Sequence, residues 1–191
     1  LLNLSTLFLN GNRLKNFDFI QFSKLKNLNS LSAENNVLNL IKYESDFELN
    51  SIINLNLKNS NINSIQDYAF ILFIKLSDLD LSYNNLRIIK ENSFKNLKNL
   101  RWLKLKNNRI ESIENSSFFD NVNLKYLNIE NNLIAFIRQA IFTGLRSLEN
   151  LILKSNKIEF IESESFSNLN KLVYLDISNN RLRSILNMTF T

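Results

Sequence analysis

The sequence predicts an α/β solenoid, a stack of coils that each place one short strand in a shared parallel sheet. The first observation is a 24-residue pattern, L-x-x-L-x-L-x-x-N-x-L-x-x-I-x-x-x-x-F-x-x-L-x-x, which runs through the 191-residue chain without a change of register. The second is the alternation of leucine with polar residues early in each copy, the periodicity of a strand with one buried face. Residues 1–191 therefore form one array of about eight repeats. The repeats begin at residues 4, 28, 52, 76, 100, 124, 148 and 172.

Each repeat is expected to contribute one strand. All copies run in the same direction, so the strands should pair in parallel, with rows about 4.8 Å apart. The rest of each repeat lacks a sustained helical period, which predicts turns and short 3₁₀ segments with little regular helix. The return side is wider than the strand side, so the stack should curve with the sheet on its concave face. Strands are predicted near residues 6–10, 30–34, 54–58, 78–82, 102–106, 126–130, 150–154 and 174–178.

Two further columns of the pattern are expected to lie in the core. An asparagine amide has two donors and one acceptor, so it can bond the turn of its own coil and that of the neighbouring coil. Phenylalanine rings can stack as an aromatic spine in the wider half of the core. The asparagine column reads Asn12, Asn36, Ser60, Asn84, Asn108, Asn132, Asn156, Asn180. The phenylalanine column reads Phe22, Asp46, Phe70, Phe94, Phe118, Phe142, Phe166, Phe190.

The second and third repeats depart from this pattern. Ala33 replaces a strand leucine, and Ser60 replaces the asparagine. Asp46 occupies the phenylalanine position, with Phe47 one place late. Two interpretations stay open: a local bulge that lets Phe47 reach the core, or a kink or contact site around residues 33–60.

The 24-residue unit, with phenylalanine eighteen places after the first leucine, resembles the typical class of leucine-rich repeat. That class is common in Toll-like receptor ectodomains, chaoptin-like adhesion proteins, Slit-type guidance proteins and small proteoglycans. The resemblance covers essentially the whole chain and implies a horseshoe-shaped recognition protein that is secreted or displayed at the cell surface. No catalytic or ligand-binding residue can be transferred from it, because the matching residues are scaffold positions.

Composition argues against an enzyme. The chain contains no Cys, His or Pro, which removes thiol nucleophiles, most zinc and haem ligands, and groups that titrate near neutral pH. No catalytic residue, metal site or cofactor is therefore expected. No apolar run reaches the roughly 20 residues that span a bilayer, so membrane attachment is expected only through segments outside this chain. Neither end shows the polar sequence of a capping repeat, so residues 1–191 are expected to be an interior part of a longer array.

The outward-facing strand positions are the predicted ligand-binding face. Trp102 and Tyr126 occupy the same column in adjacent rows, with Tyr174 two rows beyond and Ile152 nearby. Tryptophan and tyrosine are enriched in binding hot spots, although they could instead stabilise the sheet by cross-strand contact. The candidate ligand-binding residues are Trp102, Tyr126, Tyr174, Lys104, Ile152 and Asp80.

Charged residues on the same face are expected to pair across rows. The predicted pairs are Asp80 with Lys104, Glu34 with Lys58, and Glu130 with both Lys106 and Lys154. Asp78 and Asp80 lie on one face and could together hold a hard cation such as calcium. A calcium site is disfavoured, because only two carboxylates are present and a lysine lies beside them.

The net charge of +5 lies partly in the column after the asparagines, at Arg13, Arg109, Lys157 and Arg181. This flank is interpreted as a solvated edge, or else as a site for an anionic partner such as a glycosaminoglycan, an acidic protein or nucleic acid. Three N-x-[ST] sequons are candidate glycosylation sites. They begin at Asn3, Asn115 and Asn187.

These features favour a binding module of a cell-surface or secreted recognition or adhesion receptor. Its expected ligand is a protein or a glycoconjugate. A nucleic-acid ligand is disfavoured, and a homodimer is left open. The alternative function is an intracellular leucine-rich repeat scaffold that assembles other proteins in the cytoplasm.

Overall fold

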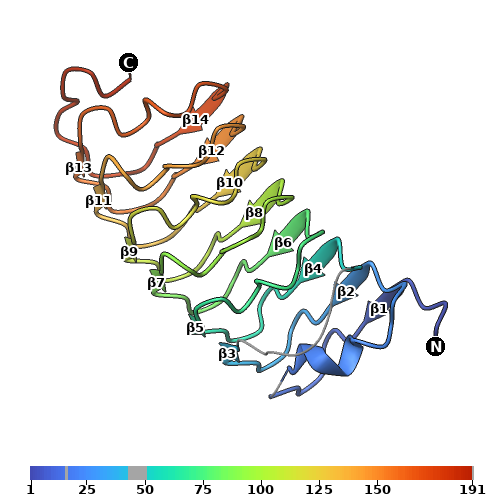
Figure 1. The fold of residues 1–191 in the computed structure, drawn as a ribbon. Helices are drawn as coiled ribbons and strands as arrows, with labels where there is room; N and C mark the ends of the chain where they lie inside the picture. The colour runs from blue at the N-terminus through green and yellow to red at the C-terminus, as the bar shows by residue number, and fades with distance from the viewer. Residues whose placement is uncertain (16, 43–50, 191) are drawn as a thin grey trace.

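A computed structural model describes residues 1–15, 17–42 and 51–190. Eight strands form one parallel sheet along the concave side of the stack, in the order of the chain (Figure 1). Neighbouring strands pair exactly one repeat apart, as Leu7 with Leu31 and Leu79 with Leu103. The predicted sheet and its register are therefore confirmed. The strands are β1 (Thr6–Phe8), β2 (Ser30–Ser32), β4 (Asn54–Asn56), β6 (Asp78–Asp80), β8 (Trp102–Lys104), β10 (Tyr126–Asn128), β12 (Asn150–Ile152) and β14 (Tyr174–Asp176).

Each strand has three residues, two fewer than predicted. Hydrogen bonds between coils nevertheless continue beyond the strand ends: the Leu9 amide donates to the Ser32 carbonyl over 2.7 Å, and the Gly11 amide donates to the Glu34 carbonyl over 2.8 Å. The extended path ends at the eighth residue of each repeat, three positions after the strand, whose φ lies between 50 and 68° in all eight copies. This left-handed region favours glycine and asparagine. The column reads Gly11, Asn35, Asn59, Tyr83, Asn107, Asn131, Ser155 and Asn179.

A second set of strands, which was not predicted, lies on the return side of the stack (Figure 1). These two-residue strands end on the isoleucine column of the pattern, whose side chains are buried and β-branched. They pair as β3 with β5, β7 with β9 and β11 with β13. Their bounds are β3 Leu40–Ile41, β5 Ser64–Ile65, β7 Ile88–Ile89, β9 Ser112–Ile113, β11 Phe136–Ile137 and β13 Phe160–Ile161. The one helical element in the described residues is a 3₁₀ turn, η1 (Phe19–Phe22).

The asparagine column bonds two coils at once, as its chemistry predicts. The Asn108 amide donates to the Leu105 carbonyl of its own coil over 2.9 Å and to the Leu81 carbonyl of the preceding coil over 3.0 Å. Its oxygen accepts from the Leu86 amide over 3.1 Å. Asn84, Asn132 and Asn156 repeat this arrangement. The column therefore stitches each turn to its neighbour.

Ser60 fills the asparagine position with a shorter side chain. Its hydroxyl still donates to the Ala33 carbonyl of the preceding coil over 2.9 Å. In the asparagine copies, the side-chain oxygen accepts a hydrogen bond from the amide 22 residues earlier, as Asn108 does from Leu86. Here the corresponding amide, that of Leu38, donates to the Ser60 main-chain carbonyl over 2.8 Å. Ser60 and Ala33 are both fully buried, so neither offers a contact surface. Asp46 and Phe47, the other departure from the pattern, lie outside the described residues.

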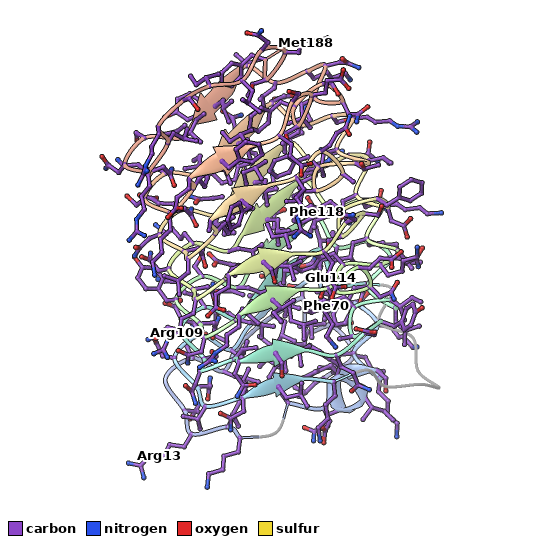
Figure 2. All side chains as sticks on the ribbon, turned by 90° about the vertical axis from the view of Figure 1, so that its left-hand side faces the viewer. Arg13, Phe70, Arg109, Glu114, Phe118 and Met188 are labelled. Carbon is purple, nitrogen blue, oxygen red and sulfur yellow. The ribbon has the colours of Figure 1, made fainter. Side chains whose placement is uncertain are left out.

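The phenylalanine column forms two stacks rather than one continuous spine. Phe70, Phe94 and Phe118 stack at 6.4 and 6.0 Å between ring centroids, inside the molecule (Figure 2). A second stack joins Phe166 to the Phe142 and Phe190 rings, at 5.8 Å each. Among the described residues, no ring contact joins the two stacks.

Candidate ligand-binding face

The concave face carries a hollow of about 270 Å³ between β1 and β8. Strand residues alternate between the core and this face, so the leucines form its floor and the third and fifth positions of each repeat form its walls. Most of these wall residues are short and polar, whereas the two ends are aromatic. We call this hollow the concave trough. It is lined by Phe8, Ser30, Leu31, Ser32, Asn54, Leu55, Asn56, Asp78, Leu79, Asp80, Trp102 and Lys104.

Two aromatic side chains bound the concave trough. Phe8 on β1 is 70% exposed, and Trp102 on β8 is 43% exposed. They lie four strands apart in the sheet, which corresponds to about 19 Å between their rows. The trough therefore offers one apolar contact at each end and hydrogen-bonding groups between them.

Trp102 and Tyr126 meet as predicted, with ring centroids 5.3 Å apart and planes tilted by 36°. The Asn128 amide donates to the Tyr126 hydroxyl over 3.2 Å and so helps to orient that ring. Tyr174 makes no ring contact with this pair among the described residues; its hydroxyl lies 3.5 Å from Asp176. The predicted aromatic patch is therefore a pair with one outlying tyrosine.

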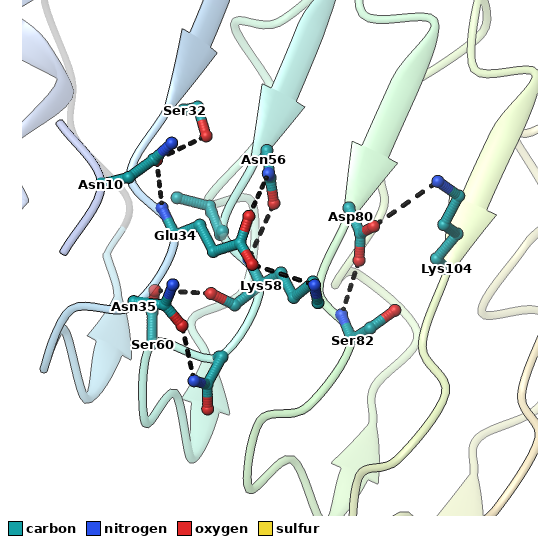
Figure 3. Close-up of polar contacts among 12 residues, drawn as sticks. Asn10, Ser32, Glu34, Asn35, Asn56, Lys58, Ser60, Asp80, Ser82 and Lys104 are labelled. Carbon is teal, nitrogen blue, oxygen red and sulfur yellow. Dashed lines mark hydrogen bonds and ion pairs between the residues drawn. The ribbon is translucent and has the colours of Figure 1, made fainter. Parts of the chain in front are cut away.

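Glu34 and Lys58 form an ion pair on the concave face, with 2.9 Å between the ammonium and a carboxylate oxygen (Figure 3). The Asn56 amide also donates to the Glu34 carboxylate over 3.2 Å. The hydrogen bond from Lys58 lowers the pKa of Glu34 below its ordinary value, and the same contact raises the pKa of Lys58. This predicted pair is thus present and holds both groups in their charged forms.

Asp80 is also paired, but the aspartate beside it is not. The Asp80 carboxylate lies 3.5 Å from the Lys104 ammonium and accepts the Ser82 main-chain amide over 2.9 Å (Figure 3). Asp78, two residues earlier on β6, has no side-chain hydrogen bond or ion pair with any described residue. Within the described chain, no group of three or more acidic side chains comes together to suit a metal ion.

The predicted pairing of Glu130 is wrong. Among the described residues, no ion pair joins Glu130 to Lys106 or to Lys154. The Lys106 ammonium lies instead over the Tyr83 ring, 5.7 Å from its centroid, and Lys58 lies 5.5 Å from the same centroid. Attraction to the electron-rich ring face thus draws Lys106 towards the preceding row and away from Glu130 in the following one.

The basic flank is not a continuous stripe. Arg13 lies near the lower end of the stack, and Arg109 lies above it on the same side (Figure 2). Uncharged residues fill this column between Arg13 and Arg109 and between Arg109 and Lys157, and only Lys157 and Arg181 lie in adjacent copies. Arg181 is 3.6 Å from Glu159, which partly neutralises it. Lys157 makes no ion pair with a described residue. The four side chains therefore do not meet in one site.

The three sequon asparagines, Asn3, Asn115 and Asn187, are all exposed. The described part of the chain has no helix that is long and apolar enough to cross a membrane.

Sequence reasoning did not single out Phe8, and it considered Asp78 only with Asp80 as a disfavoured cation site, without predicting that Asp78 would be unpaired. The sequence did contain a feature that could have identified Phe8, because a large aromatic residue stands there at an outward-facing strand position. The lack of a partner for Asp78 had no such signal, because only the positions of neighbouring side chains decide which carboxylate Lys104 reaches.

The stacked coils, parallel sheet and asparagine column define a leucine-rich repeat protein. The chain belongs to this family: the model of the BspA type leucine rich repeat region matches it in six copies, over residues 2–105 and 63–191. No curated protein matches the sequence.

Three solved structures share the fold. A chain from the TLR13–ssRNA13 complex is 28% identical, with a TM-score of 0.75 over 88% of this chain and 28% of its own length. A chain from the Toll–Spatzle complex of Drosophila is 25% identical, with a TM-score of 0.86 over 94% of this chain and 24% of its own length. The internalin InlF of Listeria monocytogenes is 22% identical, with a TM-score of 0.71 over 95% of this chain and 50% of its own length. This chain thus spans half or less of each of these three structures.

Proposed function

We propose that this chain is a protein-binding segment of a cell-surface or secreted receptor, and that its concave face holds the ligand. The observation that carries the proposal is the concave trough, bounded by Phe8 and Trp102 and walled by hydrogen-bonding side chains. A hollow with aromatic anchors and a polar wall is the usual form of a protein-binding hot spot. The similar Toll structure was solved in complex with Spatzle, which supports a protein ligand for this chain as well.

The test is a binding measurement with the 191-residue chain and a panel of purified extracellular proteins. For a saturable partner, Trp102→Ala and Tyr126→Ala should each weaken binding by more than about 1 kcal/mol. Phe136→Ala is the matched control, because Phe136 is a similarly exposed aromatic residue, at 56%, on the return side. It should leave the affinity unchanged.

The opposite pattern would contradict the proposal. If both concave substitutions left the affinity unchanged while Arg13→Ala or Arg181→Ala abolished binding, the ligand would belong to the basic flank. Binding there should also weaken strongly with salt, because exposed charges are screened within about 10 Å at 0.1 M ionic strength.

The surface location has its own test. When the chain is expressed through a eukaryotic secretory pathway, we expect a glycosidase-sensitive gain in mass that Asn115→Gln reduces. A glycan-free product that binds its partner only in the cytoplasm would favour the intracellular scaffold.

A further inference from the structure

We propose that the concave trough recognises a basic side chain, arginine or lysine, on an extended segment of the protein partner. This inference rests on the proposed function and adds the chemistry of the ligand. Its starting point is the charge of the trough, which contains Asp78 and Asp80 but only one basic residue, Lys104. The trough is therefore acidic although the whole chain carries a net charge of +5.

The unpaired carboxylate is the group that needs a partner. Lys104 and the Ser82 amide hold Asp80, whereas Asp78 is half-buried and pairs with no described side chain. A half-buried carboxylate in a hollow has lost part of its water, so an incoming cation gains more there than on an open surface. Asp78 is thus an acceptor positioned for a cationic ligand.

Trp102 lies next to Asp78 and supplies the second contact. The two residues are register partners on β6 and β8, so their Cα atoms are about 4.8 Å apart. Tyr126 occupies the opposite neighbouring row, which leaves the indole open towards β6 and the trough. A guanidinium can pair with a carboxylate through parallel hydrogen bonds while its plane stacks on an aromatic ring. The Asp78–Trp102 pair offers both contacts.

Phe8 fixes the length of the bound segment. Phe8 and Asp78 are three rows apart, or about 14 Å, and an extended chain advances about 3.4 Å per residue. A ligand with an apolar residue about four positions from its basic residue can therefore reach both. Between them lies Asn54, whose amide has no side-chain hydrogen bond with a described residue and is free to bond the ligand backbone. Nucleic acid fits poorly, because its phosphates would meet an unpaired carboxylate.

Trp102 also provides the readout, since it is the one tryptophan in the chain. The probe is a blocked six-residue peptide with leucine first, arginine fifth, and serine or threonine elsewhere. We expect it to change Trp102 fluorescence in a saturable, salt-sensitive way. Replacing the arginine by citrulline, a neutral isostere, or introducing Asp78→Asn should each weaken binding roughly tenfold.

Exchanging the charges of residue 78 and of the peptide tests whether Asp78 contacts the ligand directly or only supports the structure. Asp78→Lys should reject the arginine peptide and bind a peptide with glutamate at the fifth position. The inference would be overturned if the arginine and citrulline peptides bound with equal affinity in the Trp102 fluorescence titration. It would also be overturned if the arginine peptide caused no fluorescence change at about millimolar concentration. The proposed function has separate outcomes. If Phe8→Ala and Trp102→Ala abolished binding of a protein partner but Asp78→Asn left it unchanged, only the basic-ligand inference would be overturned. If none of the three substitutions changed binding of the partner, both the proposed function and the basic-ligand inference would be overturned.

Discussion

The indole ring of Trp102 lies 5.3 Å from the phenol ring of Tyr126, one coil further along the sheet. The pair stands on the outward face of the sheet, whereas the aromatic residues of the described core are phenylalanines. Its contribution to stability is therefore separable from its proposed role in binding.

A double-mutant cycle measures that contribution. Trp102→Ala, Tyr126→Ala and the double variant should show a coupling free energy of about 0.5–1.5 kcal/mol in urea unfolding, the range for aromatic pairs. A coupling near zero would mean that the rings touch without stabilising the stack, and binding would then be their main role.

The Glu34–Lys58 pair predicts a pH-dependent stability. A carboxyl group with a lowered folded-state pKa stabilises the protein above its unfolded-state pKa, and this stability is lost as the pH falls through the folded-state value. Lys58→Met should therefore lower the free energy of unfolding at pH 7 by less than about 1 kcal/mol, because the pair is partly solvated. The difference from the native chain should vanish in acid, below the lowered pKa of Glu34. A difference that persisted there would show that Lys58 acts by packing.

The raised pKa of Lys58 sets the upper limit of the same window. Its stabilising effect is present below the unfolded-state pKa and is lost as the pH rises through the folded-state value. Thermal unfolding between pH 2 and 7 should thus report the Glu34 side of the pair without interference from the lysine.

The asparagine column predicts a large effect from a single buried amide. Asn108→Ala removes the donors to the Leu81 and Leu105 carbonyls and the acceptor for the Leu86 amide, and we expect it to cost about 2 kcal/mol or more. Asn12→Ala is the matched control, because Asn12 is exposed and, among the described residues, its side chain bonds only carbonyls of its own coil. It should cost less than about 1 kcal/mol. Equal losses in urea unfolding would contradict a role in joining coils.

The two glycines predict opposite responses to substitution. A Cβ atom at Gly144, where φ is +100°, would lie 2.5 Å from the Phe119 main chain, so Gly144→Ala should cost about 2 kcal/mol or more. Gly11 has a φ of +68° and no atom within 4 Å of the added Cβ, and other copies carry asparagine in its place. Gly11→Asn should therefore change the unfolding midpoint little. A tolerated Gly144→Ala would show that the Phe119 segment can move aside.

The sequence predicts most of the scaffold because, in a solenoid, the position of a residue within its repeat determines where it lies in the stack. Residues one repeat apart become neighbours, so the leucine columns, the paired rows and the two-coil bonding of Asn108 follow from the pattern alone. The same logic places Trp102 beside Tyr126. It does not show where the extended path ends, because the left-handed residue three positions after each strand can be asparagine, glycine, serine or even Tyr83.

The sequence by itself thus determined the fold, the register and the outward columns, since these depend on a period that every copy repeats. Only the tertiary structure decided which charges pair and where the sheet is hollow. Lys104 reaches Asp80 and leaves Asp78 without a side-chain partner among the described residues, and the Lys106 ammonium lies over the Tyr83 ring instead of beside Glu130. Such choices depend on side-chain conformations and on energies of about 1 kcal/mol or less, which a pattern of residue types does not contain. The concave trough arises in the same way, from short side chains standing between Phe8 and Trp102.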